Sequence, residues 1–363
     1  MRLELERRPA HSQLMTVLSP VIAIGLTLIA GAILFLLAGI SPVDGLYTYF
    51  ISPVTSAYSA QEVLVKASPL ILIALGLALC FQANVWNIGA EGQYTLGAVF
   101  GGWLALALAD VDTPLVLVVV LLAGIVGGML WAAIPALLKT VFRANEILTS
   151  LMLTYVALLL IDYLVRGPLR DPAGYNFPES ALFSSAATLP GLSSGGRLHL
   201  GVLFAFVLAI IMAFALPTTL KGFEIRTVGQ APRAARFAGF GDKGMVLFVF
   251  LASGGLAGLA GIAEVSGTLN QLLPTISPGY GFTAIIVAFL GRLNPIGIVF
   301  AGLVMSISFI GGEAAQIRLG LPLDVAKVFQ GILLFFILAC DTLIYYRLRL
   351  YRPRAVPAGD ART

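Results

Sequence analysis

Residues 81–98 read FQANVWNIGAEGQYTLGA, and they interrupt an otherwise apolar part of the chain. The run KASPLILIALGLALC (66–80) precedes them, and a second apolar run, TLGAVFGGWLALALA (95–109), begins at their end. The interruption combines amide and acid side chains with two glycines: Gln82, Asn84, Asn87, Glu91, Gln93, Gly89 and Gly92. It is either a polar turn at a membrane surface or a break in a helix beside the functional site.

The whole chain is too apolar for a soluble protein. Of its 363 residues, 59% are hydrophobic and 11% are charged, whereas soluble domains carry about 25% charged residues. The longest polar stretch, 166–197, is rich in Gly, Pro and Ser and too short to form a soluble domain. We therefore predict an all-α polytopic membrane protein with a single membrane-embedded domain over 1–363.

Ten apolar segments come near the length of about 20 residues that a helix needs to cross a bilayer. The second, third and eighth of them are short. The segments are 17–39, 67–83, 94–109, 114–138, 147–165, 198–216, 244–264, 280–291, 295–312 and 323–346.

Lys and Arg indicate the sidedness of these spans, because they concentrate in cytoplasmic loops. Arg2, Arg7 and Arg8 place the N-terminal segment 1–16 in the cytoplasm. Ten crossings then bring two basic segments, the loop 217–243 and the tail 347–363, to the same side. The prediction is N-in and C-in, and the net charge of +4 reflects this loop asymmetry.

Two regions share a rhythm of short apolar span, glycine-rich polar break and second span. They are 71–103 and LPTISPGYGFTAIIVAFLGRLNPIGIVFAGLV (273–304). If spans 2–5 and 7–10 are repeats, they have opposite orientations, and inverted repeats with broken helices are typical of transporters. The alternative is chance, since the chain holds 39 glycines.

The break at 84–93 is costly unless protein or water surrounds it. Unpaired backbone groups are not tolerated against lipid, and an acid such as Glu91 at the bilayer centre costs about 2.5–3.5 kcal/mol. Trp86 suits either an interface or stacking on a flat ligand. Asn84, Trp86, Asn87 and Glu91 are therefore candidates for lining a solute path. The alternative is a tight interfacial turn with satisfied amides.

A second polar insertion, RANEILTSLMLTY, covers 143–155. Asn145 and Glu146 open a span there, and hydroxyl side chains continue into its apolar part. Asn145 and Glu146 are further candidates for the solute path. The alternative is an ordinary helix start whose hydroxyls bond to their own backbone.

The basic loop contains PRAARFAGF (232–240), which predicts a short helix beginning at Pro232 and ending near Gly239. Ala234, Ala235 and Ala238 would form a small-residue face on which another protein can pack. The alternative is a solvated, positively charged loop.

Several common catalytic and nucleotide-binding motifs are absent from the sequence. It contains no GxxxxGK[ST], HExxH or GxSxG motif, and its two Cys and two His are isolated. We expect no enzyme activity, no bound metal and no cofactor on this chain. It also lacks a basic stripe with interleaved aromatics, so nucleic acid is not an expected partner.

Four stretches together resemble the permease subunits of bacterial ABC importers for simple sugars and nucleosides. They cover about residues 60–345: NVWNIGAEGQYTLGA (84–98), NEILTSLMLTY (145–155), GFEIRTVGQAPRAARFAGF (222–240) and GYGFTAIIVAFLGRLNPIG (279–297). WNIGAEGQ and the GYGF…LGRLNP stretch are most similar to the nucleoside branch. The segment 40–62 resembles an extra segment of the larger of two paired permeases.

The resemblance implies a set of partners in the bacterial inner membrane. A second permease, either a paralogue or a second copy of this chain, would complete the pore, and an extracytoplasmic binding protein would deliver the solute. A cytoplasmic ABC ATPase, which binds ATP and Mg²⁺, would dock on the loop 221–240. The residues carried over for this coupling are Gly222, Arg226, Gly229, Pro232, Ala234, Ala235 and Gly239.

The function expected is ATP-driven import of a nucleoside or a related small polar solute by alternating access. A simple sugar is the alternative solute. A stand-alone ion-coupled transporter using Glu91 or Glu146 is the alternative class, and a channel is a third. The sequence does not distinguish nucleoside from sugar, nor a homodimeric from a heterodimeric pore.

Overall fold

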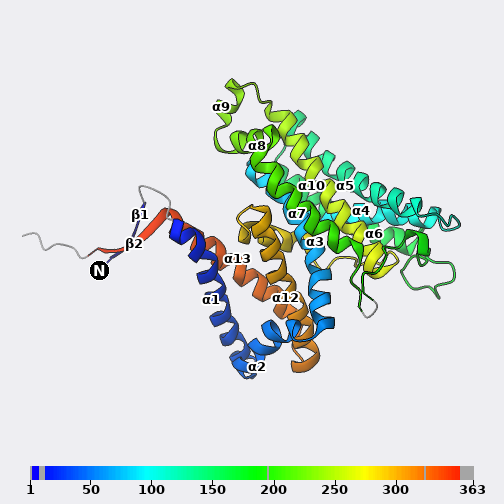
Figure 1. Ribbon diagram of the computed structural model, residues 1–363, viewed down its shortest axis with the longest axis horizontal. Helices are drawn as coiled ribbons and strands as arrows, with labels where there is room; N and C mark the ends of the chain where they lie inside the picture. Colours follow the sequence, from blue (N-terminus) through cyan, green and yellow to red (C-terminus); the bar gives the residue numbers. More distant parts are fainter. Residues whose placement is uncertain (1, 8–12, 194–195, 323, 352–363) are drawn as a thin grey trace, which may run out of the picture. The chain divides into compact units, whose positions relative to one another are not determined.

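The computed structural model describes residues 2–7, 13–193, 196–322 and 324–351 (Figure 1). The described chain is almost entirely helical. Its α-helices are α1 (Gln13–Leu37), α2 (Pro42–Leu46), α3 (Ala57–Gln82), α4 (Ala90–Ala107), α5 (Leu115–Phe142), α6 (Glu146–Arg166), α7 (Leu200–Thr218), α8 (Leu220–Gln230), α9 (Pro232–Phe237), α10 (Asp242–Glu264), α11 (Tyr280–Leu290), α12 (Pro295–Leu319) and α13 (Asp324–Tyr345). Short π- and 3-10 turns are η1 (Tyr47–Ile51), η2 (Ser52–Val54), η3 (Ser185–Ala187) and η4 (Val265–Leu269).

The chain divides into two compact units, one formed by 1–46 with 327–363 and the other by 47–326. In the first unit, α1 and α2 are neighbours, and the Phe35 and Phe329 rings lie 5.5 Å apart between centroids. Two strands that the sequence did not predict, β1 (Arg2–Arg7) and β2 (Tyr346–Tyr351), pair antiparallel.

The predicted cytoplasmic ends lie partly outside the described residues. Arg8 of the segment 1–16, and Arg352 and Arg354 of the tail 347–363, belong to that undescribed part. The sidedness of both ends stays a prediction.

Each of the ten predicted spans corresponds to a helix, with ends that differ by several residues: α1, α3 to α7 and α10 to α13. Six of the described helices are long and apolar enough to cross a membrane. They cover Ala57–Gln82, Leu115–Phe142, Glu146–Arg166, Leu200–Thr218, Asp242–Leu269 and Pro295–Leu319. The chain is thus a multi-pass membrane protein, and ten crossings remain a prediction.

The second unit is built around α3. Every residue from 67 to 80 is buried, since α3 packs against α7, α10, α11 and α12. A helix that is apolar on all sides can be enclosed in this way. By contrast, α6 and α7 expose many of their apolar side chains, which leaves them to face lipid or another subunit.

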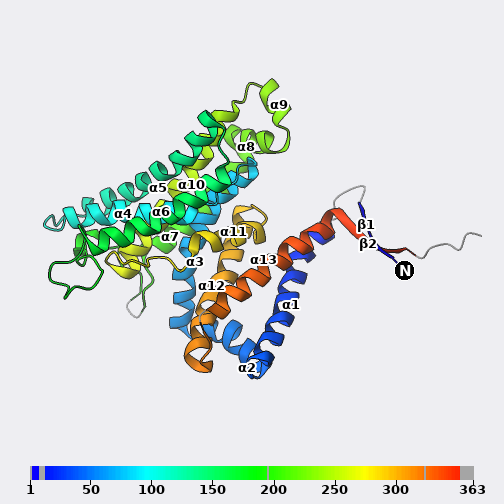
Figure 2. The ribbon, with the colours of Figure 1, turned by 180° about the vertical axis from the view of Figure 1, so that it is seen from behind.

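Glycines allow α10 to approach α4 and α5 at backbone distance. A Cβ on Gly258 would overlap the carbonyl oxygen of Gly124, and one on Gly97 would overlap the backbone of Gly258. Small residues permit this close packing between membrane helices. The helices α4, α5 and α10 consequently lie side by side (Figures 1 and 2).

We expect Gly258→Ala to destabilise the protein by about 1–3 kcal/mol, because the added methyl meets backbone that cannot yield. Gly244→Ala is the matched control. It lies on the same helix with nothing near its Cβ position, so it should gain up to about 1 kcal/mol of helix propensity. Thermal unfolding of the detergent-solubilised protein measures both, and equal melting temperatures would contradict the close contact.

Candidate functional site

The polar break begins where α3 ends, at Asn84. This residue adopts a left-handed conformation, with φ +56°, and the amide of Val85 donates to the carbonyl of Cys80 at 2.9 Å. Asn84 itself donates to the Phe81 carbonyl at 3.0 Å. These are the bonds of a Schellman motif at a helix C-terminus. Its left-handed position is usually occupied by Gly and sometimes by Asn. The Asn84 amide is exposed, so helix termination accounts for this residue.

Asn87 holds the middle of the break in a buried hydrogen-bond network. Its amide and the amide of Gln93 exchange two hydrogen bonds of 3.0 Å each. Asn87 also donates to Ser253 Oγ at 3.1 Å and accepts from the backbone of Gly89 at 3.0 Å. Ser253 is the middle residue of α10, so the break reaches the centre of a helix that can span the membrane. Such networks are stable when every member is paired.

Glu91 joins the two breaks that the sequence pattern singled out. It lies in the first turn of α4 and is 2% exposed. Its Oε2 accepts a 2.5 Å hydrogen bond from the amide of Gly281, in the first turn of α11. A Cβ on Gly281 would overlap Glu91, so only glycine fits there. The carboxylate thus lies at the positive end of the α11 dipole, and we call this contact the Glu91–Gly281 junction.

Two other residues complete the start of α11. Gly279 has φ +101°, which favours glycine. The Ser277 hydroxyl accepts from the amides of Gly279 and Tyr280 at 3.1 and 2.9 Å. The sequence analysis missed Ser253 and Ser277, since an isolated serine in an apolar or turn segment carries no distinctive pattern.

Trp86 lies in an aromatic group and keeps one part of its ring free. Its ring lies 5.3 Å from that of Phe81 and 6.1 Å from that of Phe289, between centroids. It is 39% exposed. Among the break residues with large side chains it is the one available for contact with a ligand or an interface.

The second polar insertion has the geometry of a helix start. Asn145 is exposed, and its side chain accepts from the amide of Ile147 at 2.9 Å. Glu146 pairs with Lys139 of α5. Ser150 bonds to the carbonyl of Glu146 at 2.6 Å and also accepts from the amide of Ile88 at 3.1 Å. The insertion therefore caps α6 and braces the break from the side.

The predicted short helix is confirmed as α9. Pro232 occupies its start, and Gly239 follows its end with φ +83°. Two residues of α8 make close backbone contacts, Gly222 with Leu216 and Gly229 with Gln82. Arg226 donates to the Leu216 carbonyl at 3.2 Å. Gly222, Gly229 and Arg226 therefore contribute to packing within the chain.

The predicted small-residue face is wrong at Ala235. This side chain is fully buried in a cluster with Ile225, Val228 and Met245. Residues 234 and 235 are adjacent, so they point about 100° apart on a helix, and α9 turns the side that carries Ala235 toward this cluster. Ala234 and Ala238 are exposed, and beside them Phe237 is 93% exposed. Helices α8 and α9 lie together at one end of α7 and α10 (Figure 2).

His199 acts as a helix cap. It precedes α7 and its Nδ1 accepts from the amide of Gly201 at 3.1 Å. The other histidine, His11, lies outside the described residues.

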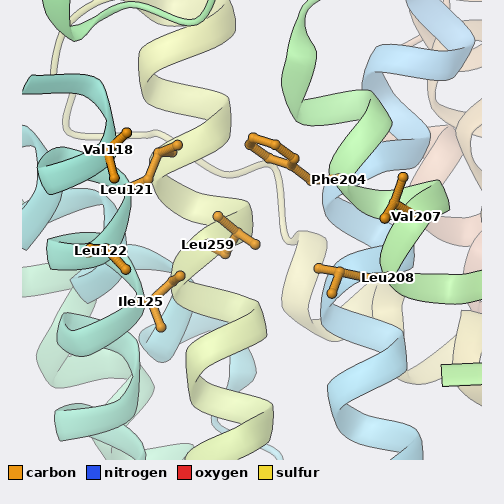
Figure 3. Close-up of a pocket in the computed structure, with 8 residues that line it drawn as sticks. All are labelled: Val118, Leu121, Leu122, Ile125, Phe204, Val207, Leu208 and Leu259. Atoms are coloured by element: carbon orange, nitrogen blue, oxygen red, sulfur yellow. The ribbon is translucent and has the colours of Figure 1, made fainter. Parts of the chain in front are cut away.

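Figure 3 shows a groove between α5, α7 and α10 that is lined by apolar side chains. Leu121 and Ile125 face it from α5, Phe204 and Leu208 from α7, and Leu259 from α10. A polar solute would lose its hydrogen bonds to water there without replacement. The groove is therefore unsuitable for such a solute.

Replacing Glu91 tests whether the residue holds the junction. Glu91→Gln keeps an acceptor oxygen for the Gly281 amide, whereas Glu91→Leu leaves that amide unpaired. We expect the Leu variant to be less stable than the Gln variant by about 1–3 kcal/mol, measured by thermal unfolding in detergent. Equal stability of the two variants would indicate a side chain that only contacts solute.

Comparison with known proteins identifies a family to which the chain is similar. Residues 59–338 match the model of a family described as "Branched-chain amino acid transport system / permease component". The glucose ABC transporter permease protein TsgB13 of Haloferax volcanii is 38% identical over 95% of this chain and 94% of the relative. No solved structure matches the chain.

Two further relatives are named for nucleosides. The nucleoside ABC transporter permease protein NupB of Lactococcus lactis is 31% identical over 95% of this chain and 96% of its own length. The guanosine ABC transporter permease protein NupP of Bacillus subtilis is 33% identical over 88% and 92%. Each of these two bacteria also has a more distant relative of this chain, NupC and NupQ, at 25% and 30% identity.

Proposed function

The chain belongs to the family of branched-chain amino acid transport system permease components and is a permease subunit of an ABC importer; we propose that it moves a nucleoside or a related small polar solute by alternating access. The choice of a nucleoside as the solute rests on the two relatives named for nucleosides. The relative named for glucose keeps a simple sugar as the second candidate. A stand-alone ion-coupled transporter is not favoured, since these relatives are all named as ABC permeases.

The proposal includes the arrangement in the membrane. The chain would cross the cytoplasmic membrane ten times, with both ends inside, and spans 2–5 and 7–10 would form an inverted repeat. The Glu91–Gly281 junction supports this, because it joins one broken segment of each half. Asn84, Trp86, Asn87, Glu91, Asn145 and Glu146 are the path residues proposed, and Trp86 is the one whose exposure best suits solute contact.

The proposal also includes three partner proteins. A second permease, a paralogue or another copy of this chain, would complete the pore, and the paired permease names in two bacteria support a paralogue. An extracytoplasmic protein would deliver the solute. A cytoplasmic ATPase would bind ATP and Mg²⁺ and dock on α8 and α9, where Arg233, Ala234, Phe237 and Ala238 are exposed.

Transport by the reconstituted complex tests the proposed function. We expect proteoliposomes holding both permeases, the ATPase and the binding protein to take up guanosine or glucose only with ATP. An ATPase variant unable to hydrolyse ATP should give no uptake, and neither should the chain alone. Uptake by this chain alone, driven by a proton gradient, would contradict the proposal.

Phe237→Ala tests the docking surface. A large exposed aromatic side chain is the kind of residue that dominates an interface, and its loss costs 2 kcal/mol or more at such a position, about 30-fold in affinity. We expect the ATPase to be lost on co-purification, while the membrane part remains folded.

Two further variants complete that experiment. Phe177→Ala removes another exposed phenylalanine, 64% exposed, from the loop between α6 and α7, and it should leave ATPase binding unchanged. Ala235→Trp should instead destabilise the whole chain, because its site is filled. Normal co-purification of the Phe237→Ala complex would refute the docking assignment.

A further inference from the structure

A cluster of ionisable side chains lies where α3, α10 and α12 meet the segment before α7. Arg197 makes two hydrogen bonds to the Glu62 carboxylate, one of them Nε to Oε1 at 3.1 Å. This pairing raises the pKa of Arg197. Lys66 Nζ lies 3.6 Å from Glu313 Oε1. Both basic groups of the cluster are thus already paired with an acid.

Glu264, the last residue of α10, is an acid of this cluster that has no such ion pair. Its side chain is 5% exposed, and its Oε2 is buried with no hydrogen-bond partner in the described part of the chain. Thr268, four residues beyond Glu264, has its Oγ1 3.3 Å from Nε2 of His199, so the end of α10 lies beside the segment that carries Arg197. An acceptor buried without a donor destabilises the fold, and such a group in a native structure calls for an explanation.

Aromatic rings connect this cluster to the Glu91–Gly281 junction. Lys66 Nζ lies 5.7 Å from the centre of the Tyr280 ring, and Tyr280 opens α11 beside Gly281. The Tyr280 ring contacts the Tyr94 ring at 5.9 Å between centroids. Tyr94 lies on α4, less than one turn beyond Glu91. Polar and aromatic side chains therefore continue from Arg197 to the break.

We propose that Glu264 is a binding residue for the solute, and that its free carboxyl oxygen accepts hydrogen bonds from a pair of adjacent hydroxyl groups. This inference rests on the proposed function and deepens it. Guanosine and glucose both carry such vicinal hydroxyls, one pair on the ribose and others on the hexose. A carboxylate has two oxygens and about four acceptor positions, so it can take both hydroxyls of a pair.

A metal ion is the competing ligand for a free carboxylate. Glu313 and Glu62 already pair with Lys66 and Arg197, so a metal ion would have Glu264 as its one unpaired acid ligand in the cluster. The described residues contain no group of three or more His, Cys, Asp or Glu side chains placed to hold a metal. The observations thus favour a neutral hydroxyl-bearing solute.

The test compares each solute with its deoxy form in proteoliposomes of the complete complex. The pairs are guanosine with 2′-deoxyguanosine and glucose with 2,4-dideoxyglucose, since neither deoxy form keeps two adjacent hydroxyl groups. The pair that the wild type imports identifies the source of the diol. Rates are taken at saturating solute, where the binding protein is fully loaded with either form. Any difference then arises in the membrane part.

We expect the wild type to import the diol solute faster than its deoxy form. Glu264→Gln should slow the diol solute about tenfold, which matches the loss of one hydrogen bond to a charged acceptor. It should slow the deoxy form much less, so the preference disappears. Asp162→Asn is the matched control, since it changes another acid to its amide in the exposed pair with Arg166, and it should leave both rates unchanged.

If Glu264→Gln prevents assembly of the complex, Glu264→Asp replaces it, and this variant should keep the preference for the diol. Equal slowing of both solutes, unchanged rates, or a metal-ion requirement that Glu264→Gln removes would each overturn the diol site alone. Failure of the wild type to import any solute with ATP would overturn the proposed function and the diol site together.

Discussion

The Glu91–Gly281 junction is the contact on which the rest of the structure depends. A chain that interrupts its helices inside a membrane must pair every freed amide and carbonyl within the protein. Glu91 pairs an amide at the start of α11, and Asn87 and Ser150 pair amides at the start of α4. The first break is therefore largely buried at 87–91, where Ser150 of α6 and Ser253 of α10 brace it. The segment 84–93, for which the sequence left open a surface turn or a functional break, is joined to the start of α11.

The alternating access that we propose for this permease would require this joint to move. The Glu91–Gly281 hydrogen bond and the missing side chain of Gly281 hold the two helix starts close together, and the Tyr94 and Tyr280 rings pack beside them. Movement of α3 or α10 would therefore shift both helix starts together. Helices α8 and α9 precede α10 directly in the chain, so a partner bound there would act on the joint through α10. Coupling between distant sites needs such a contiguous element with two arrangements.

Local sequence predicted the helices well, because the length of an apolar run and the positions of Pro232 and Gly239 fix where a helix starts and ends. It also located both breaks. It could not predict their contact, since Glu91 and Gly281 are 190 residues apart and no short pattern encodes that distance. The burial of Ala235 and the free oxygen of Glu264 were missed for the same reason. Asn84 and Asn145 also have structural roles, since the backbone of Asn84 ends α3 and the side chain of Asn145 caps α6. Their place in the path stays a prediction.

Amide hydrogen exchange of the assembled complex tests the buried joint most directly. Peptides covering 84–93 and 277–283 report on the amides of Ile88, Gly89 and Gly281, which are bonded to Ser150, Asn87 and Glu91. Paired and buried amides exchange slowly, as in core helices. Our account predicts such protection in the absence of ATP. Exchange of these amides as fast as in the loop 170–178 would contradict it.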